Sequence, residues 1–349
     1  MARINPRDSF QSLRKTITII GGGLTGLSLA IALRRREVPV ILHEAASYPR
    51  HRVCGEFISG VSAETLENLG ISGQFSDCLH HTSIAWYSKN ELLRRNSLPA
   101  PAIAISRYLL DDRLQKLAVA LGVELHQKSR QRIDPGKSGV VWSAGRKPAR
   151  GEWIGLKAHL RGIENHSAEK AHLEMHSGPQ GYLGITPVEN GWSNVCGLFR
   201  LDKTIPGKRE SLIPAYLRRN GNTVLASAIE DAEWKPASFN AVAGFQLGLQ
   251  APLAGLLSLG DSHAIIPPFT GNGMTMAFQS AEIATPHLIS YADSNSTWEE
   301  TCSSINSALS DHFRKRLTAS RMIHPLLFQP FSKWLLRHTP IQPVLALIR

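Results

Sequence analysis

The hexapeptide Gly21-Gly22-Gly23-Leu24-Thr25-Gly26 decides the fold, because it carries the GxGxxG pattern on its first, third and sixth residues. A short β-branched run at 16–20 precedes it, and residues 25–36 follow with the apolar spacing of a helix. A second apolar run at 38–43 completes a strand–turn–helix–strand unit. The glycines suit a tight turn, a close approach of the backbone to a pyrophosphate, and helix–strand packing. We predict a dinucleotide site contacted by Gly21, Gly23, Leu24, Thr25 and Gly26.

Glu44 strengthens this prediction. It ends the second apolar run, with 17 residues between it and Gly26, where a carboxylate can accept both ribose hydroxyls of an adenosine. The alternative is an exposed acid at a strand end. At this point of the argument both NAD and FAD remain open as the dinucleotide.

A distant segment, GDSHAIIPPFTGNG at 260–273, favours FAD. It follows an apolar stretch at 253–259, predicted as a buried strand, and precedes a helix predicted from Met274 to about Ala284. A simple NAD-binding domain has no use for such an element more than two hundred residues after its glycine turn. With it, residues 16–300 resemble the FAD-dependent superfamily of aromatic hydroxylases (group A monooxygenases) and geranylgeranyl reductases.

This resemblance implies roles for several residues. Gly260 and Asp261 match the motif whose aspartate binds the ribityl chain of FAD, and Arg107 matches an arginine that opens a helix beside the cofactor. Gly271, Asn272 and Gly273 match the turn that aims a helix N-terminus at the pyrimidine side of the flavin, where reduction places negative charge. A surface or N-terminal-turn arginine is the alternative for Arg107.

The segment RHRVCGEF at 50–57 resembles the Cys-Gly-Glu loop of the geranylgeranyl-reductase branch. The resemblance implies that Cys54 lies near the reactive face of the flavin, so Cys54 is the catalytic candidate, to gate access, contact substrate or tune the flavin. A buried structural cysteine is the alternative. Arg50 and Arg52 either contact cofactor phosphates, the role assigned to Arg52, or are solvated. If they lie close to Cys54, they would lower its pKa.

The apolar period changes to two between residues 153 and 199, with a hairpin turn at Asn190-Gly191. Lys157 and His159 would then share one face of a strand, either lining a pocket roof or pointing to solvent. The stretch after a helix at 62–69 reads as less regular up to Pro101. We predict an α/β fold: a Rossmann-like FAD-binding domain, an antiparallel β-sheet substrate domain and a helical C-terminal tail. Their predicted bounds are 16–75 plus 102–150 plus 244–309, then 76–101 plus 151–243, then 310–349.

Composition excludes several classes of protein. The chain has 349 residues, 42% of them apolar, which is enough for a large core. Thirty-nine basic and 28 acidic residues give a charge of +11, which favours anionic partners, but no nucleic-acid motif accompanies it. Four cysteines without a CxxC pair predict a reducing cytoplasm, and the histidines show no metal-binding spacing, so no metal site is expected. No apolar run reaches the 18 residues of a membrane span.

The function expected from the resemblance is an FAD-dependent oxidoreductase with NADPH or NADH as electron donor. The first expected reaction is hydroxylation of an apolar or aromatic small molecule. Reduction of carbon–carbon double bonds in an isoprenoid or lipid is the first alternative. A non-catalytic prenyl or lipid carrier is the second. The tail at 328–349 is basic and apolar, and it would either lie on the inner face of a membrane or pack as a helix on the cofactor domain. The oligomeric state stays open.

Overall fold

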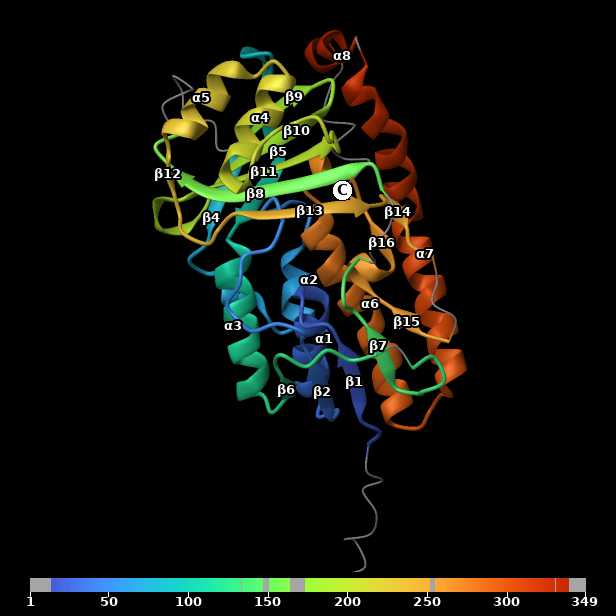
Figure 1. Ribbon diagram of the computed structural model, residues 1–349. Helices are drawn as coiled ribbons and strands as arrows, with labels where there is room; N and C mark the ends of the chain where they lie inside the picture. The colour runs from blue at the N-terminus through green and yellow to red at the C-terminus, as the bar shows by residue number, and fades with distance from the viewer. Residues whose placement is uncertain are drawn as a thin grey trace, which may run out of the picture.

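The computed structural model describes residues 14–132, 134–146, 151–163, 173–251, 255–329 and 331–338. Two sheets organise these residues, one above the other in Figure 1. The lower sheet is entirely parallel, in the order β15-β7-β1-β2-β6. Its strands are β1 (Ile17–Ile20), β2 (Val40–His43), β6 (Glu124–His126), β7 (Val140–Trp142) and β15 (Leu257–Ser258). The predicted Rossmann-like sheet is therefore confirmed.

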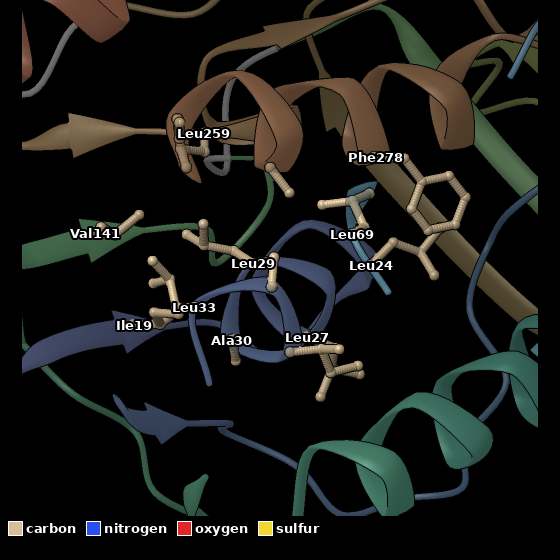
Figure 2. Close-up of a cluster of buried hydrophobic side chains, with 14 of the residues drawn as sticks. Ile19, Leu24, Leu27, Leu29, Ala30, Leu33, Leu69, Val141, Leu259 and Phe278 are labelled. Carbon is tan, nitrogen blue, oxygen red and sulfur yellow. The ribbon is translucent and has the colours of Figure 1, made fainter. Parts of the chain in front are cut away.

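The helix after the glycine turn, α1 (Leu24–Arg34), is buried around its whole circumference. It lies against helices α3 (Arg107–Ala120) and α6 (Gly273–Ala292) and against the sheet, which explains why its residues 24–33 are all buried. Figure 2 shows Leu27, Leu29 and Leu33 of this helix among side chains from several other elements. Each fully buried leucine contributes about 1.5–3 kcal/mol, so this core anchors the strand–turn–helix unit.

The upper sheet has nine strands, and all but one pair of neighbours run antiparallel. Its order is β12-β8-β11-β10-β9-β4-β5-β3, with β13 also paired to β8. The strands are β3 (Phe57–Ile58), β4 (Leu79–Ser88), β5 (Glu91–Ala104), β8 (Trp153–Arg161), β9 (Leu173–Gly178), β10 (Gly181–Pro187), β11 (Ser193–Arg200), β12 (Glu233–Trp234) and β13 (Asn240–Phe245). A two-stranded ribbon joins β14 (Gly248–Leu249) to β16 (Ala264–Ile265).

Alternation along β8 separates the two faces of this sheet. Ile154, Leu156, Ala158 and Leu160 form one cluster with side chains of helices α4 (Leu212–Arg219) and α5 (Thr223–Asp231), so these helices cover that face. Lys157 and His159 point to the opposite face, and neither has exposed surface. The alternative in which they are solvated is therefore wrong.

The hairpin predicted at Asn190-Gly191 is confirmed. Both residues have positive φ, 60° and 71°, and the Trp192 amide donates to the Glu189 carbonyl across the turn over 3.4 Å. The flanking strands β10 and β11 pair from Pro187 with Ser193 to Gly181 with Phe199. The alternating pattern also predicts a strand at 171–176; residues 171–172 lie outside the described residues, and the rest belongs to β9.

Several predicted elements differ from the structure. The stretch predicted to be less regular up to Pro101 contains β4 and most of β5, a long pair whose register is interrupted by bulges. Helix α6 continues through Pro286 to Ala292, because it packs against α1 and against α7 (Trp298–Ile323) and accommodates the proline. The buried strand expected at 253–259 contains only the two residues of β15, and 252–254 lie outside the described residues.

The C-terminal part is helical, but it does not begin at 310. Helix α7 (Trp298–Ile323) runs unbroken across that position, just as β13 runs across the boundary expected at 243–244. Figure 1 shows α7 along one side of the molecule, from the level of the lower sheet to that of the upper one. The short helices η7 (His324–Phe328) and α8 (Ser332–His338) then contact β9 and β5. This described end of the tail packs on the antiparallel sheet, not on the cofactor domain. No helix within the described ranges has the length and apolar character that crossing a bilayer needs.

Candidate functional site

The predicted cofactor motifs meet at the carboxyl edge of the parallel sheet. Gly21 follows β1, Glu44 follows β2, and Ser143 follows β7. The Gly21 amide donates to the His43 carbonyl over 2.8 Å, and the Ser143 hydroxyl donates to the Gly21 carbonyl over 2.8 Å. Ligands of open α/β sheets bind at this edge, where neighbouring strands end together.

A side chain would meet different surroundings at Gly26 and at Gly23 of the hexapeptide. A Cβ on Gly26 would lie 2.0 Å from the Gly21 carbonyl oxygen, so Gly26 is required for the helix to pack on the turn. A Cβ on Gly23 would meet no atom within 4 Å. Gly23 therefore borders open space, and packing within the protein does not require a glycine there.

Glu44 is buried, with 3% of its surface exposed, so the alternative of an exposed acid is wrong. Its Oε2 accepts the Gly22 amide over 2.9 Å and its Oε1 accepts the Ala46 amide over 2.9 Å. Arg50 and Arg52 approach the same carboxylate at 2.8 and 3.4 Å. The acid is thus tied directly to the glycine turn, with donors on both oxygens.

Asp111 extends this set of charges, and the sequence analysis missed it. Its carboxylate has no exposed surface and receives Arg107 over 2.7 and 2.9 Å and Arg52 over 3.0 Å. Neither arginine is a free surface cation, so the solvated alternative for Arg52 and the surface alternative for Arg107 are wrong, whereas Arg107 does stand in the first turn of α3. The signal was available, because Arg107 and Asp111 stand four residues apart on a predicted helix, the spacing of an ion pair on one face.

The distant motif lies against the first one. A Cβ on Gly260, whose φ is +59°, would lie 2.3 Å from the Thr25 hydroxyl, so Gly260 and Thr25 are in contact. Asp261 follows with an exposed side chain, within the electrostatic reach of Arg52, Arg107 and Arg146. Arg52 also contacts Glu44 at 3.4 Å, so this one arginine links the two acids electrostatically.

The turn before α6 joins the Cys-Gly-Glu loop to this region. Gly271 has a φ of +68°, and a Cβ there would lie 2.9 Å from the Phe57 ring. The Gly271 carbonyl accepts the Ser59 amide over 3.2 Å, and the Thr275 hydroxyl donates to the Ser59 carbonyl over 2.7 Å. A Cβ on Gly273, like one on Gly23, would meet nothing within 4 Å.

The two helix N-termini at this site suit an anionic cofactor. Helices α3 and α7 begin with side-chain caps from Ser106 and Thr297. Helices α1 and α6 begin at Gly23 and Asn272 without a side-chain cap and without an acid in the first turn. Their N–H groups and positive dipole ends are available for phosphate or a reduced flavin ring. The donors, the open glycines and the buried ribose-type carboxylate fit FAD.

Cys54 is half-buried beside the Arg107 guanidinium. Burial raises its pKa, more than Arg107 lowers it, so the thiol is protonated at neutral pH. The expectation that Arg50 and Arg52 would lower this pKa is wrong, because both arginines are engaged by Glu44 and Asp111. A neutral thiol can contact or orient a substrate, but it is a poor nucleophile.

Comparisons with known proteins agree with this geometry. Residues 5–80 match the family model described as pyridine nucleotide-disulphide oxidoreductase. The menaquinone reductase of Mycolicibacterium smegmatis is 22% identical, over 91% of this chain and 85% of its own length. A putative FAD-dependent monooxygenase of Bacillus subtilis, YetM, is 34% identical over 32% of each chain.

A solved structure extends the likeness to nearly the whole chain. An HpxO variant of Klebsiella pneumoniae, solved as a complex with FAD, superposes with a TM-score of 0.74 at 13% identity. The match covers 95% of this chain and 96% of that one. At this identity the likeness concerns the fold. The match shows that this chain shares the two-sheet architecture of that FAD complex.

Proposed function

We propose that this protein binds FAD non-covalently across Gly21–Gly26, Glu44, Asp261 and the start of α6, and that it oxygenates an apolar, ring-containing small molecule. The observation that carries the proposal is the contact between Gly260 and Thr25, because it joins two motifs more than two hundred residues apart into one site. When bound, FAD supplies hydride acceptance and oxygen activation. The chain binds and orients the reactants and keeps water away.

The inner face of the antiparallel sheet supports an apolar substrate. Trp86, Met175, Tyr182 and Leu198 form a buried cluster there with Phe57, which follows the Cys-Gly-Glu loop. An apolar wall beside a flavin excludes water, which favours productive oxygen transfer over loss of the oxidant. NADH or NADPH would serve as the electron donor, and the cytoplasm as the compartment.

Double-bond reduction is the second candidate, and one observation favours it. The menaquinone reductase, whose name gives a quinone as substrate, matches over 91% of this chain, whereas the monooxygenase relative matches over only 32%. The Cys-Gly-Glu loop at 54–56 supports the same branch by its resemblance to geranylgeranyl reductases. The third candidate function is a prenyl or lipid carrier that catalyses no redox reaction. It predicts a protein that stays colourless after addition of FAD.

One experiment separates these functions. The purified protein with FAD is reduced anaerobically with NADH or NADPH, mixed with a panel of phenols and prenylated quinones, and divided into anaerobic and ¹⁸O₂-containing samples. Oxygenation predicts a product that carries ¹⁸O and forms only with oxygen. A product that forms without oxygen and stays two hydrogens heavier after its quinone ring is reoxidised would replace the leading function with the second. Reduction by neither nucleotide, in a protein that binds FAD, would contradict the electron donor.

A further inference from the structure

A buried ionic cluster joins the Cys-Gly-Glu loop to the antiparallel sheet. The Glu56 carboxylate lies 3.2 Å from the Lys157 ammonium and 2.6 Å from His159 Nε2. Its Oε1 also accepts the Arg107 amide over 2.9 Å, at the first turn of α3. Glu56, Lys157 and His159 each have no exposed surface.

Burying such a cluster costs free energy of solvation, so it contributes little net stability to a fold. Two charges that leave water lose solvation that their attraction only partly restores, and an apolar pair of the same volume is often as stable. Glu56 also has a φ of +53°, a left-handed conformation that is strained for a residue with a Cβ. Strain of this kind persists where surrounding contacts enforce it, and it concentrates at functional sites.

The three groups that contact the Glu56 carboxylate come from two different parts of the fold. Lys157 and His159 belong to β8, and Arg107 starts the helix whose side chains reach Asp111. Burial alone would raise the pKa of Glu56, but the Lys157 ammonium and the His159 bond hold it below its usual value. The carboxylate is therefore ionised, and it needs these partners.

The nitrogen and oxygen atoms of His51, Glu56 and His159 also lie within 4.8 Å of one another, close enough to bind a metal ion. The Lys157 ammonium stands among them, 3.0 Å from His51 Nδ1 and 3.2 Å from Glu56 Oε1. Burial and the neighbouring Lys157 lower the pKa of His51 to about 3, so its ring is neutral and Nδ1 accepts a hydrogen bond from the ammonium. Lys157 itself supplies the positive charge that this ligand set can bind.

Further contacts fix the loop on the sheet. Asn194, the partner of His159 on β11, donates its amide to the Cys54 carbonyl over 3.0 Å. A Cβ on Gly155 of β8 would lie 2.9 Å from the Val53 side chain, so the loop packs tightly there. A Cβ on Gly55, in contrast, would meet nothing within 4 Å. One side of the loop is therefore held by β8 and β11, and the other borders open space.

We infer that Lys157 and His159 are positioning residues, which act through the Glu56 carboxylate to hold the Cys54–Gly55 turn and the start of α3 in the arrangement that the reaction uses. The inference rests on the proposed function for the reaction itself. The held geometry, however, exists in the protein without turnover. Loss of one partner leaves a buried charge uncompensated, and the loop then opens to water.

The test measures how readily iodoacetamide alkylates Cys54, read for that peptide by mass spectrometry. In Lys157→Met we expect the alkylation rate to rise at least about tenfold, because the uncompensated carboxylate draws the loop open. In Glu56→Gln the ammonium is left uncompensated and the rate should rise likewise. The double variant Glu56→Gln/Lys157→Met removes both charges and should return the rate to within about threefold of the wild type.

Arg161→Met is the matched control, because Arg161 is a cation on the same strand and face whose side chain is 42% exposed. Its alkylation rate should stay within about twofold of the wild type, since an exposed ion pair contributes little. If Lys157→Met fails to fold, the other variants still test the inference. Unchanged alkylation in folded Lys157→Met or Glu56→Gln, or a double variant as reactive as the single ones, would overturn it.

Turnover provides a second readout. We expect kcat to fall in Lys157→Met by a larger factor than the affinity for FAD, because the side chains assigned to the cofactor are themselves unchanged. A large loss of FAD affinity with unchanged kcat would contradict a positioning role in the reaction. If no substrate turns over in any variant, the proposed function fails, whereas the alkylation result still decides whether the cluster holds the loop.

Discussion

Alanine should have different effects at two glycines of the same turn: Gly26→Ala should lower the stability of the fold, and Gly23→Ala should weaken the binding of FAD. The structure places open space beside Gly23 and the Gly21 carbonyl oxygen 2.0 Å from a Cβ on Gly26. Gly26→Ala must therefore push α1 off the turn. Overpacking of this kind costs about 1–3 kcal/mol, and more when the opposing atom is rigid backbone, so we expect about 3 kcal/mol or more.

Gly23→Ala should leave the fold intact. Alanine is a poorer N-cap than glycine, but it also lowers the entropy of the unfolded chain, so the net change should be within about 1 kcal/mol. The added methyl group occupies the space proposed for the pyrophosphate. Loss of one charge-assisted hydrogen bond there is worth about 1.5–3 kcal/mol, which weakens FAD binding about tenfold to a hundredfold.

The assay has two parts, urea unfolding of the FAD-free protein and titration of FAD by flavin fluorescence. Gly73→Ala is the control, because Gly73 is exposed, far along the chain from the motif, and a Cβ there would also meet nothing within 4 Å. It should change neither quantity. Wild-type FAD affinity in Gly23→Ala would refute the cofactor site, and wild-type stability in Gly26→Ala would refute the packing argument.

Three further variants test other parts of the site. Asp261→Ala removes an exposed carboxylate, so the FAD-free protein should keep its stability while FAD affinity falls about tenfold to a hundredfold; an unchanged Kd would contradict the ribityl assignment. Asp111→Ala leaves two arginines without their buried partner and should lower the free energy of unfolding by about 3–5 kcal/mol, against less than about 1 kcal/mol for Asp112→Ala, whose partner is a surface lysine. Burial, with help from Arg200, lowers the pKa of His324 from 6.5 to about 4. The unfolded chain therefore binds the proton first, and stability that is present above pH 6.5 falls as the pH drops towards 4. We expect a loss of about 2 kcal/mol between pH 7 and 5 that His324→Phe reduces, and an equal loss in the variant would exclude His324 as the cause.

Local sequence patterns determined the strand–turn–helix unit and the β10–β11 hairpin. Both depend on neighbours in the chain: glycines where the backbone needs them, and an Asn-Gly pair that accepts positive φ. The pair β4 and β5 escaped detection because its apolar alternation is broken by bulges and by half-exposed positions. Its pairing with β9, which is parallel and distant in sequence, helps to stabilise it.

The chemical types of the site residues could also be predicted from sequence, because a dinucleotide site needs a glycine turn and a carboxylate at fixed spacing. Their electrostatic partners could not. Asp111 engages the arginines assigned to the cofactor, and burial of the Cys54 sulfur outweighs the nearby cations. The Glu56 cluster joins a loop near residue 55 to a strand one hundred residues later. Charge pairing and desolvation depend on distances between segments remote in sequence, so only the tertiary structure decided which of these charges meet and which side chains leave water.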